Sequence, residues 1–162
     1  MSVSYVSVQW NRHKRVYDTI ATAGVAAFVA VFVLTSQLVQ GSSAPTIPVL
    51  LLRALGVCAI VLLHIILTIG PLARLTPLAA PLLYNRRHLG VLTFLVGLAH
   101  ASLATLYYGA FGDRNPVLVL LGTNAAFSSI SGFPFEVLGL AALLVLFLMA
   151  ATSHDFWLKN LG

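Results

Sequence analysis

Residues 48–72 read PVLLLRALGVCAIVLLHIILTIGPL, with Arg53 as the one Lys, Arg, Asp or Glu in the run. A helix needs about 20 predominantly apolar residues to cross the hydrocarbon core of a bilayer. Three further runs meet this requirement, at residues 19–39, 89–108 and 135–153. The sequence therefore predicts an all-α integral membrane bundle of four transmembrane helices.

The amino-acid composition also indicates a membrane protein. The 162 residues are 59% hydrophobic and 8% charged, and their mean hydropathy is +0.97. Soluble domains carry about 25% charged residues, and a small soluble fold leaves much of its surface in water. The basic residues flank the apolar runs rather than cluster on one face, which argues against nucleic acid as a partner. The single cysteine, Cys58, excludes an internal disulfide framework and cysteine-rich metal sites.

One transmembrane domain is expected over residues 19–153, between an interfacial N-terminal segment, 1–18, and a tail, 154–162. A cleavable signal peptide is the rival interpretation of the first run. That run is too long for a signal peptide, and no clean small-residue cleavage pattern follows it. We therefore expect a retained first helix.

The connections between the runs differ in character. Gly70 and Pro71 predict an end or a kink of the second helix. Residues 74–88, with two prolines, predict an extended or broken segment rather than one helix. The stretch VLVLLGTNAAF at 117–127 is too short to span and predicts an interfacial or re-entrant segment.

Basic residues predict the orientation, because cytoplasmic loops carry an excess of Lys and Arg. Seven of the nine fall on one side of a chain with four crossings. We therefore expect both termini in the cytoplasm and a multi-pass protein of the bacterial inner membrane. The seven are Arg12, Lys14, Arg15, Arg74, Arg86, Arg87 and Lys159.

Two histidines, His64 and His100, lie within the apolar runs, where ionisable residues are candidates for function. His64 lies eight residues before Leu72 and His100 eleven after Leu89. At 1.5 Å per residue they are about 12 and 16 Å from the same side. These depths predict two imidazoles at a similar level on antiparallel helices. Axial imidazoles hold haem iron in helical bundles.

Small residues accompany both histidines, and the macrocycle of a haem needs such residues to approach a backbone. They are Gly97, Ala99, Ala101 and Ala104 around His100, and Gly56 and Ala59 before His64. The competing interpretation is a neutral histidine hydrogen-bonded across a helix interface, with Gly and Ala serving helix packing. Both interpretations stay open at this point.

Charged residues near the membrane boundaries give three further expectations. Arg86 and Arg87 form a basic anchor for haem propionates, and His88 beside them is expected to contact a lipid headgroup. Arg53 and Glu136 are expected to pair near the outer interface. The alternative for that pair is a snorkelling arginine and a glutamate that favours a helix N-terminus. No hydrolytic or nucleotide-binding motif occurs, so the sequence leaves open whether the chain is an enzyme.

Three stretches resemble the ferric-reductase-like transmembrane domain, a superfamily with bacterial haem b membrane subunits. They are RALGVCAIVLLHIILTIGPLARLTP (53–77), LLYNRRHLGVLTFLVGLAHASLA (82–104) and LGLAALLVLFLMAATSHDFWLKNLG (138–162). The most specific portion is the RRHLG sequence at 86–90 followed by His100. The chain is similar to the N-terminal half of that domain.

The resemblance implies a cofactor, haem b, at His100. In the family the matching histidine is an iron ligand, paired with a histidine on a later helix that follows the segment matching 154–162. The sequence given ends at Gly162, so the resemblance leaves three options. His64 substitutes as the second ligand, a partner chain supplies it, or the chain is a haem-free subunit. The resemblance implies no oxidation of nicotinamide cofactors, because the family's flavin and nicotinamide domains are not in this sequence.

Two functions follow from these observations. The first is a membrane-embedded b-type cytochrome, or cytochrome subunit, that takes part in electron transfer. The second is a haem-free structural or accessory subunit of a larger respiratory or photosynthetic membrane complex. Both predict the lipid bilayer and other membrane protein subunits as partners. A transporter is disfavoured, because transporters often contain inverted repeats and this sequence shows none.

Overall fold

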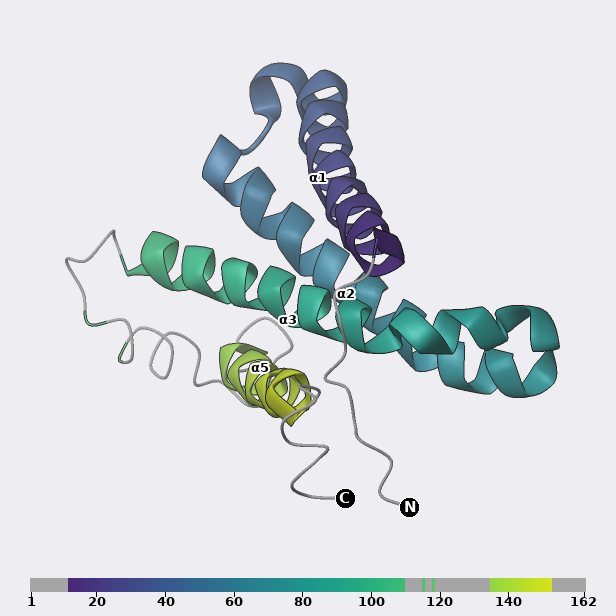
Figure 1. Cartoon of the computed structure of the whole chain (residues 1–162). Coiled ribbons are helices and arrows are strands. Elements are labelled where there is room, and N and C mark those ends of the chain that lie inside the picture. The colour runs from purple at the N-terminus through teal and green to yellow at the C-terminus, as the bar shows by residue number, and fades with distance from the viewer. Residues whose placement is uncertain (1–11, 110–114, 116–117, 119–134, 153–162) are drawn as a thin grey trace, which may run out of the picture.

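The computed structural model describes residues 12–109, 115, 118 and 135–152 (Figure 1). Within these ranges the chain is helical and contains no strand, which confirms the all-α prediction. Four helices are long and apolar enough to cross a membrane. They are α1 (Arg12–Gln40), α2 (Ile47–Leu75), α3 (Ala80–Tyr108) and α5 (Phe135–Thr152).

Parts of three expectations lie outside the described residues. These parts are the first eleven residues of the interfacial segment, the apolar stretch at 117–127 apart from Leu118, and the tail at 154–162. Residues 12–18 are described, and they are helical. The first helix therefore begins before Thr19, where the apolar run starts.

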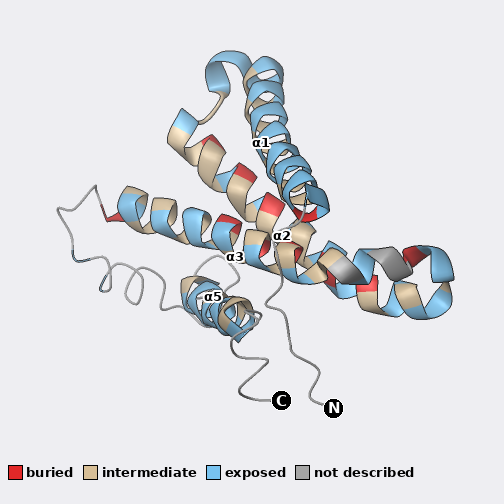
Figure 2. Ribbon diagram, viewed as in Figure 1, coloured by how far each residue is buried: buried red, intermediate tan, exposed pale blue. Residues whose placement is uncertain are grey.

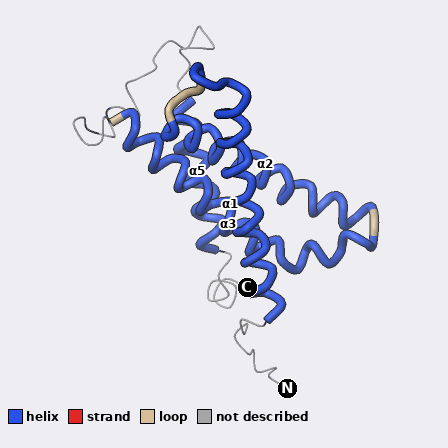
Figure 3. The backbone as a smooth tube through the Cα atoms, turned by 90° about the horizontal axis from the view of Figure 1, so that it is seen from above, coloured by secondary structure: helices blue, strands red, loops and turns tan. Residues whose placement is uncertain are grey.

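Helices α2 and α3 form an antiparallel hairpin at the centre of the bundle (Figures 1 and 3). A short 3-10 helix, η2 (Pro77–Ala79), closes the hairpin. Helix α1 packs mainly against α2 and touches α3, whereas α5 packs against α3. Every described helix therefore contacts the hairpin, and α3 is the helix that α1, α2 and α5 share.

The prediction that residues 74–88 are broken rather than one helix is confirmed, but the break is confined to residues 76–79. Helix α2 continues through Pro71 to Leu75, and α3 begins at Ala80. Only Thr76, with φ −141° and ψ 129°, is extended, as a residue before a proline prefers. Pro81 lies in the first turn of α3, where the missing N–H of a proline leaves no hydrogen bond unmade.

The buried apolar residues follow the hairpin, and the outer faces of the helices are exposed (Figure 2). Ile66, Ile69 and Leu89 form a small cluster across α2 and α3. Many large apolar side chains on α1 and α5 are more than half exposed, Leu38 and Leu144 among them. In a bilayer such side chains contact lipid, which is as apolar as they are. The other buried apolar residues are Leu50, Ala54, Cys58, Ala79 and Val96.

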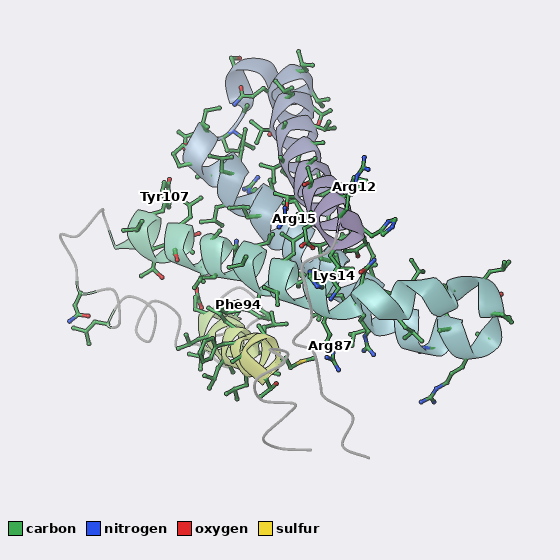
Figure 4. The ribbon with its side chains drawn as sticks, viewed as in Figure 1. Arg12, Lys14, Arg15, Arg87, Phe94 and Tyr107 are labelled. Carbon is green, nitrogen blue, oxygen red and sulfur yellow. The ribbon has the colours of Figure 1, made fainter. Side chains whose placement is uncertain are left out.

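Helix α5 rests on a face of α3 that is distinct from the α2 face. A Cβ atom built on Gly97 would lie 3.6 Å from Leu143 Cδ1, so this glycine leaves room for a leucine of α5. About one helical turn before Gly97, Phe94 of α3 (Figure 4) contacts Phe147 of α5, with ring centroids 5.7 Å apart. Small and aromatic residues together therefore fix α5 against α3.

The orientation of the bundle in the membrane stays a prediction. Arg12, Lys14 and Arg15 of α1 lie at the same end of the bundle as Arg87 of α3 (Figure 4). The excess of basic residues predicts that this end faces the cytoplasm. Asn115, in the segment after α3, should then face outward. In a Cys58→Ser background, Asn115→Cys should react with an impermeant maleimide added to intact cells; reaction only after the cells are opened would contradict the orientation.

Candidate functional site

His100 lies in the interface between α3 and α2. Its half-buried ring is directed at α2, with Nδ1 3.0 Å from the backbone oxygen of Leu52. One helical turn further along α2, Gly56 lies under the ring. A Cβ built on Gly56 would be 2.9 Å from His100 Cε1 and 3.2 Å from Nδ1. The imidazole therefore occupies space that a side chain at position 56 would need.

The contact with Leu52 defines which nitrogen of His100 carries the proton. A carbonyl oxygen only accepts hydrogen bonds, so Nδ1–H is the donor to Leu52. In the neutral imidazole, Nε2 then holds the lone pair. Ligating histidines usually donate their other N–H to a carbonyl or carboxylate, which fixes the ring and the tautomer. His100 thus has the chemistry that an iron ligand requires.

His64 has a different environment, on the exposed surface of α2. Its Nδ1–H donates to the backbone oxygen of Ile60, 2.8 Å away in the same helix. The bond stays within one turn, so it fixes the imidazole against α2 itself. No second helix takes part in it.

The expectation that His64 and His100 share a level was wrong. Gly56 of α2 lies against His100 of α3, and Gly70 of α2 lies against Arg86 of α3. The two contacts are 14 residues apart on both helices, so α2 and α3 keep the same register between them. His64 is eight residues beyond Gly56, about 12 Å along the axis at 1.5 Å per residue. The reason for the error is that α3 begins at Ala80 and not near Leu89. The structure does not bring the two imidazoles together.

The basic pair proposed for propionates is also distant from His100 in the structure. Arg86 lies across the hairpin from Gly70, its Nη1 3.6 Å from a Cβ built there. Arg87 is exposed on the same turn. About 20 Å of helix separates both from His100 at 1.5 Å per residue. Arg86 and Arg87 belong to the closed end of the hairpin rather than to the surroundings of His100.

Arg53 and Glu136 occupy two helices that are not principal neighbours. Arg53 is exposed on α2, Glu136 is half-buried in the first turn of α5, and α5 packs against α3. Their pairing stays a prediction.

An interaction that the sequence did not indicate joins α1 to α3. His88 Nδ1 lies 3.0 and 3.1 Å from the two carboxylate oxygens of Asp18. Both side chains are largely covered, with exposed fractions of 24% and 31%. His88 therefore has an acidic partner within its own chain. Contact of its ring with a lipid headgroup stays a prediction. One signal was available: Asp18 is the only acid among the first 112 residues.

Breaking the bond between Asp18 and His88 should loosen α1. We expect Asp18→Ala and His88→Ala each to lower the free energy of unfolding by about 1.5–3 kcal/mol, because each removes one partner of a hydrogen bond to a charged group. The double variant should lose less than the sum of the single losses, because contacting residues couple. Thermal unfolding in detergent micelles measures each loss.

Thr19→Ala is a matched control for this cycle. Thr19 is adjacent to Asp18, but its hydroxyl donates to the backbone oxygen of Arg15 within α1. Its removal should cost little. Strictly additive losses at Asp18 and His88 would mean that the two side chains do not interact in the membrane protein.

Comparison with known proteins identifies the family. The model of the ferric reductase like transmembrane component matches residues 55–162. The chain belongs to this family. The matched region contains most of α2 and all of α3 and α5, including His64, His88 and His100. In the same comparisons, no curated protein and no solved structure gave a significant match.

Membership in the ferric-reductase-like family confirms the resemblance and indicates a membrane component of electron transfer. Members often bind haem, so haem and metal binding are implied by the family. Within the described residues, no three His, Cys, Asp or Glu side chains converge on a point where they would hold a metal ion. A haem iron takes few protein ligands, so the residue to consider is His100.

Proposed function

We propose that the protein is a membrane-embedded b-type cytochrome subunit in which His100 is an iron ligand. One observation carries the proposal: Nδ1–H of His100 donates to Leu52 across the helix interface, and Nε2 keeps the lone pair. The family match supports a membrane component of electron transfer, and His100 lies in the matched region together with His64 and His88. A bound haem b would supply a one-electron couple whose potential depends on burial and on hydrogen bonds near the ligand.

Residues of α2 would hold His100 in position for this role. The Leu52 carbonyl orients the imidazole, and Gly56 gives the ring room. Next to them, Ala54 and Cys58 are buried, so the surroundings on α2 are small and apolar. A dry environment of this kind limits solvent access, which tunes the potential of a metal site.

His64 is a poor candidate for the second ligand of the same iron, since it lies about 12 Å along α2 from the residue beneath His100. We therefore propose that the second ligand comes from a histidine outside the described residues or from another membrane subunit. We propose the bacterial inner membrane as the location, because the basic residues follow the pattern of cytoplasmic loops.

One observation favours a second candidate, a haem-free accessory subunit of a respiratory or photosynthetic complex. His100 bonds to Leu52 and packs on Gly56, as a neutral histidine does when it only joins two helices across their interface. Small residues beside such a bond serve helix packing in membranes. In this alternative, the hydrogen bond of His100 holds α2 and α3 together and has no role in redox chemistry.

A reduced-minus-oxidised visible spectrum separates the two candidates. The full chain should be produced in cells supplied with haem and purified in mild detergent with any native subunits attached. The cytochrome proposal predicts the Soret and α bands of a low-spin b-type haem. A well-folded, helical preparation that lacks these bands, alone and with its native subunits, would contradict the proposal and support the accessory role.

A further inference from the structure

The hairpin of α2 and α3 continues past the rest of the described bundle. We call residues 70–87 the hairpin tip; it comprises the end of α2, the short helix η2 and the first turns of α3. In Figures 1 and 3 the outer part of the tip stands clear of α1 and α5. The guanidinium of Arg86 lies against Gly70 and links the two helices there.

Helix length places the tip beyond the hydrocarbon core. Helices α2 and α3 have 29 residues each, or about 43 Å at 1.5 Å per residue. The hydrocarbon core is about 30 Å thick, which about 20 residues of each helix fill. If Ile47 and Tyr108 lie at one boundary, the last third of α2 and the first third of α3 pass the opposite boundary. The tip is then at the level of the lipid headgroups.

Five leucines make the surface of the tip apolar. Leu75 is 82% exposed and Leu78 is 90% exposed, and both lie at the end of the hairpin that helix length places outside the hydrocarbon core. Contiguous exposed apolar patches on a protein mark sites of interaction with membranes or partners. The other three exposed leucines are Leu72, Leu82 and Leu83.

Charge at the tip has one sign. Arg74, Arg86 and Arg87 lie within it, and residues 70–87 contain no Asp or Glu. The side chains of Arg74 and Arg87 are exposed. Leucine and arginine together, without acids, are typical of helices that lie in the membrane interface. Basic residues at that level are attracted to anionic lipids.

We propose that the hairpin tip lies in the headgroup layer and binds anionic phospholipid. The leucines enter the boundary of the acyl chains, and the arginines contact lipid phosphates. Lipid is the occupant that the geometry favours, because the tip continues two membrane-spanning helices without a break and meets the headgroups where those helices leave the core. A protein with an acidic face is the alternative, and it would leave the tip in water when only lipid is present.

Fluorescence quenching in vesicles tests where the tip lies. The full chain with Cys58→Ser and Leu78→Cys should carry a bimane label in vesicles of phosphatidylcholine and phosphatidylglycerol. We expect quenching by brominated lipid and protection from iodide, as for a label at Leu144→Cys on the exposed face of α5. Strong iodide quenching, as for a label at Asn115→Cys, would overturn the proposal and favour a protein partner.

A second arm tests the preference for anionic lipid. Bromine should be placed first on phosphatidylglycerol and then on phosphatidylcholine, at equal mole fractions. We expect brominated phosphatidylglycerol to quench the Leu78→Cys label more strongly. Arg74→Gln with Arg87→Gln should lower the preference, by about fivefold for each arginine removed. Arg53 is an exposed arginine at the other end of α2, so Arg53→Gln should leave the preference for anionic lipid unchanged. Equal quenching by both lipids in the unsubstituted tip would overturn the anionic preference.

Discussion

His100→Ala should abolish haem binding, whereas His64→Ala should leave the haem content unchanged. The ring of His100 lies between two helices with Nδ1–H bonded to Leu52, so Nε2 is the oriented donor. His64 is exposed and bonded within its own turn of α2. The measurement is haem per polypeptide, from the pyridine haemochrome spectrum of purified protein with its native subunits attached.

His100→Gln is the control that separates loss of a ligand from loss of the fold. Glutamine keeps an N–H donor for the Leu52 carbonyl and fills a similar volume, so the hairpin should remain folded. It does not ligate haem iron as imidazole does, so haem should still be lost. Retention of haem in both His100→Ala and His100→Gln would exclude His100 as the ligand. Loss in His64→Ala as well would mean that this chain supplies both ligands.

Hydropathy was sufficient to predict the four long helices, because a membrane helix must be apolar over most of its length. It could not predict where α3 begins. The apolar run starts at Leu89 because Arg86, Arg87 and His88 end it, but a helix continues for as long as its backbone hydrogen bonds are made. Helix α3 therefore extends back to Ala80. Measuring depth from Leu89 placed His100 level with His64.

The partners of individual side chains depended on tertiary structure that one sequence does not contain. Asp18 and His88 are separated by 70 positions in the chain, and their contact depends on how α1 crosses α3. The sequence places Gly56 two turns before His64 on one helix, so it was assigned to that histidine. Its actual neighbour is His100 on α3. The sequence predicted that a glycine packs beside a histidine, but only the register of α2 against α3 shows that this histidine is His100.

Gly56→Ala should destabilise the protein by about 1–2 kcal/mol, because overpacking of a filled interface costs about 1–3 kcal/mol. The new Cβ would come within 2.9 Å of His100 Cε1, so the ring must move and its bond to Leu52 must weaken. Gly90→Ala and Gly24→Ala are matched controls, since a Cβ at either position meets nothing within 4 Å. These controls should gain about 0.5–1 kcal/mol, as helical glycine is less favourable than alanine. Thermal unfolding in micelles measures the three differences.

The double variant provides the strictest test of this packing. Once His100→Ala has removed the ring, the Cβ of Gly56→Ala meets open space, and only the gain in helix propensity remains. Gly56→Ala should therefore destabilise the natural chain but stabilise the His100→Ala chain, by about 0.5–1 kcal/mol. A change of sign of this kind cannot come from helix propensity alone, because propensity acts equally in both backgrounds. If Gly56→Ala has the same effect with and without His100, the imidazole does not lie on Gly56, and the position of His100 between α2 and α3 is wrong.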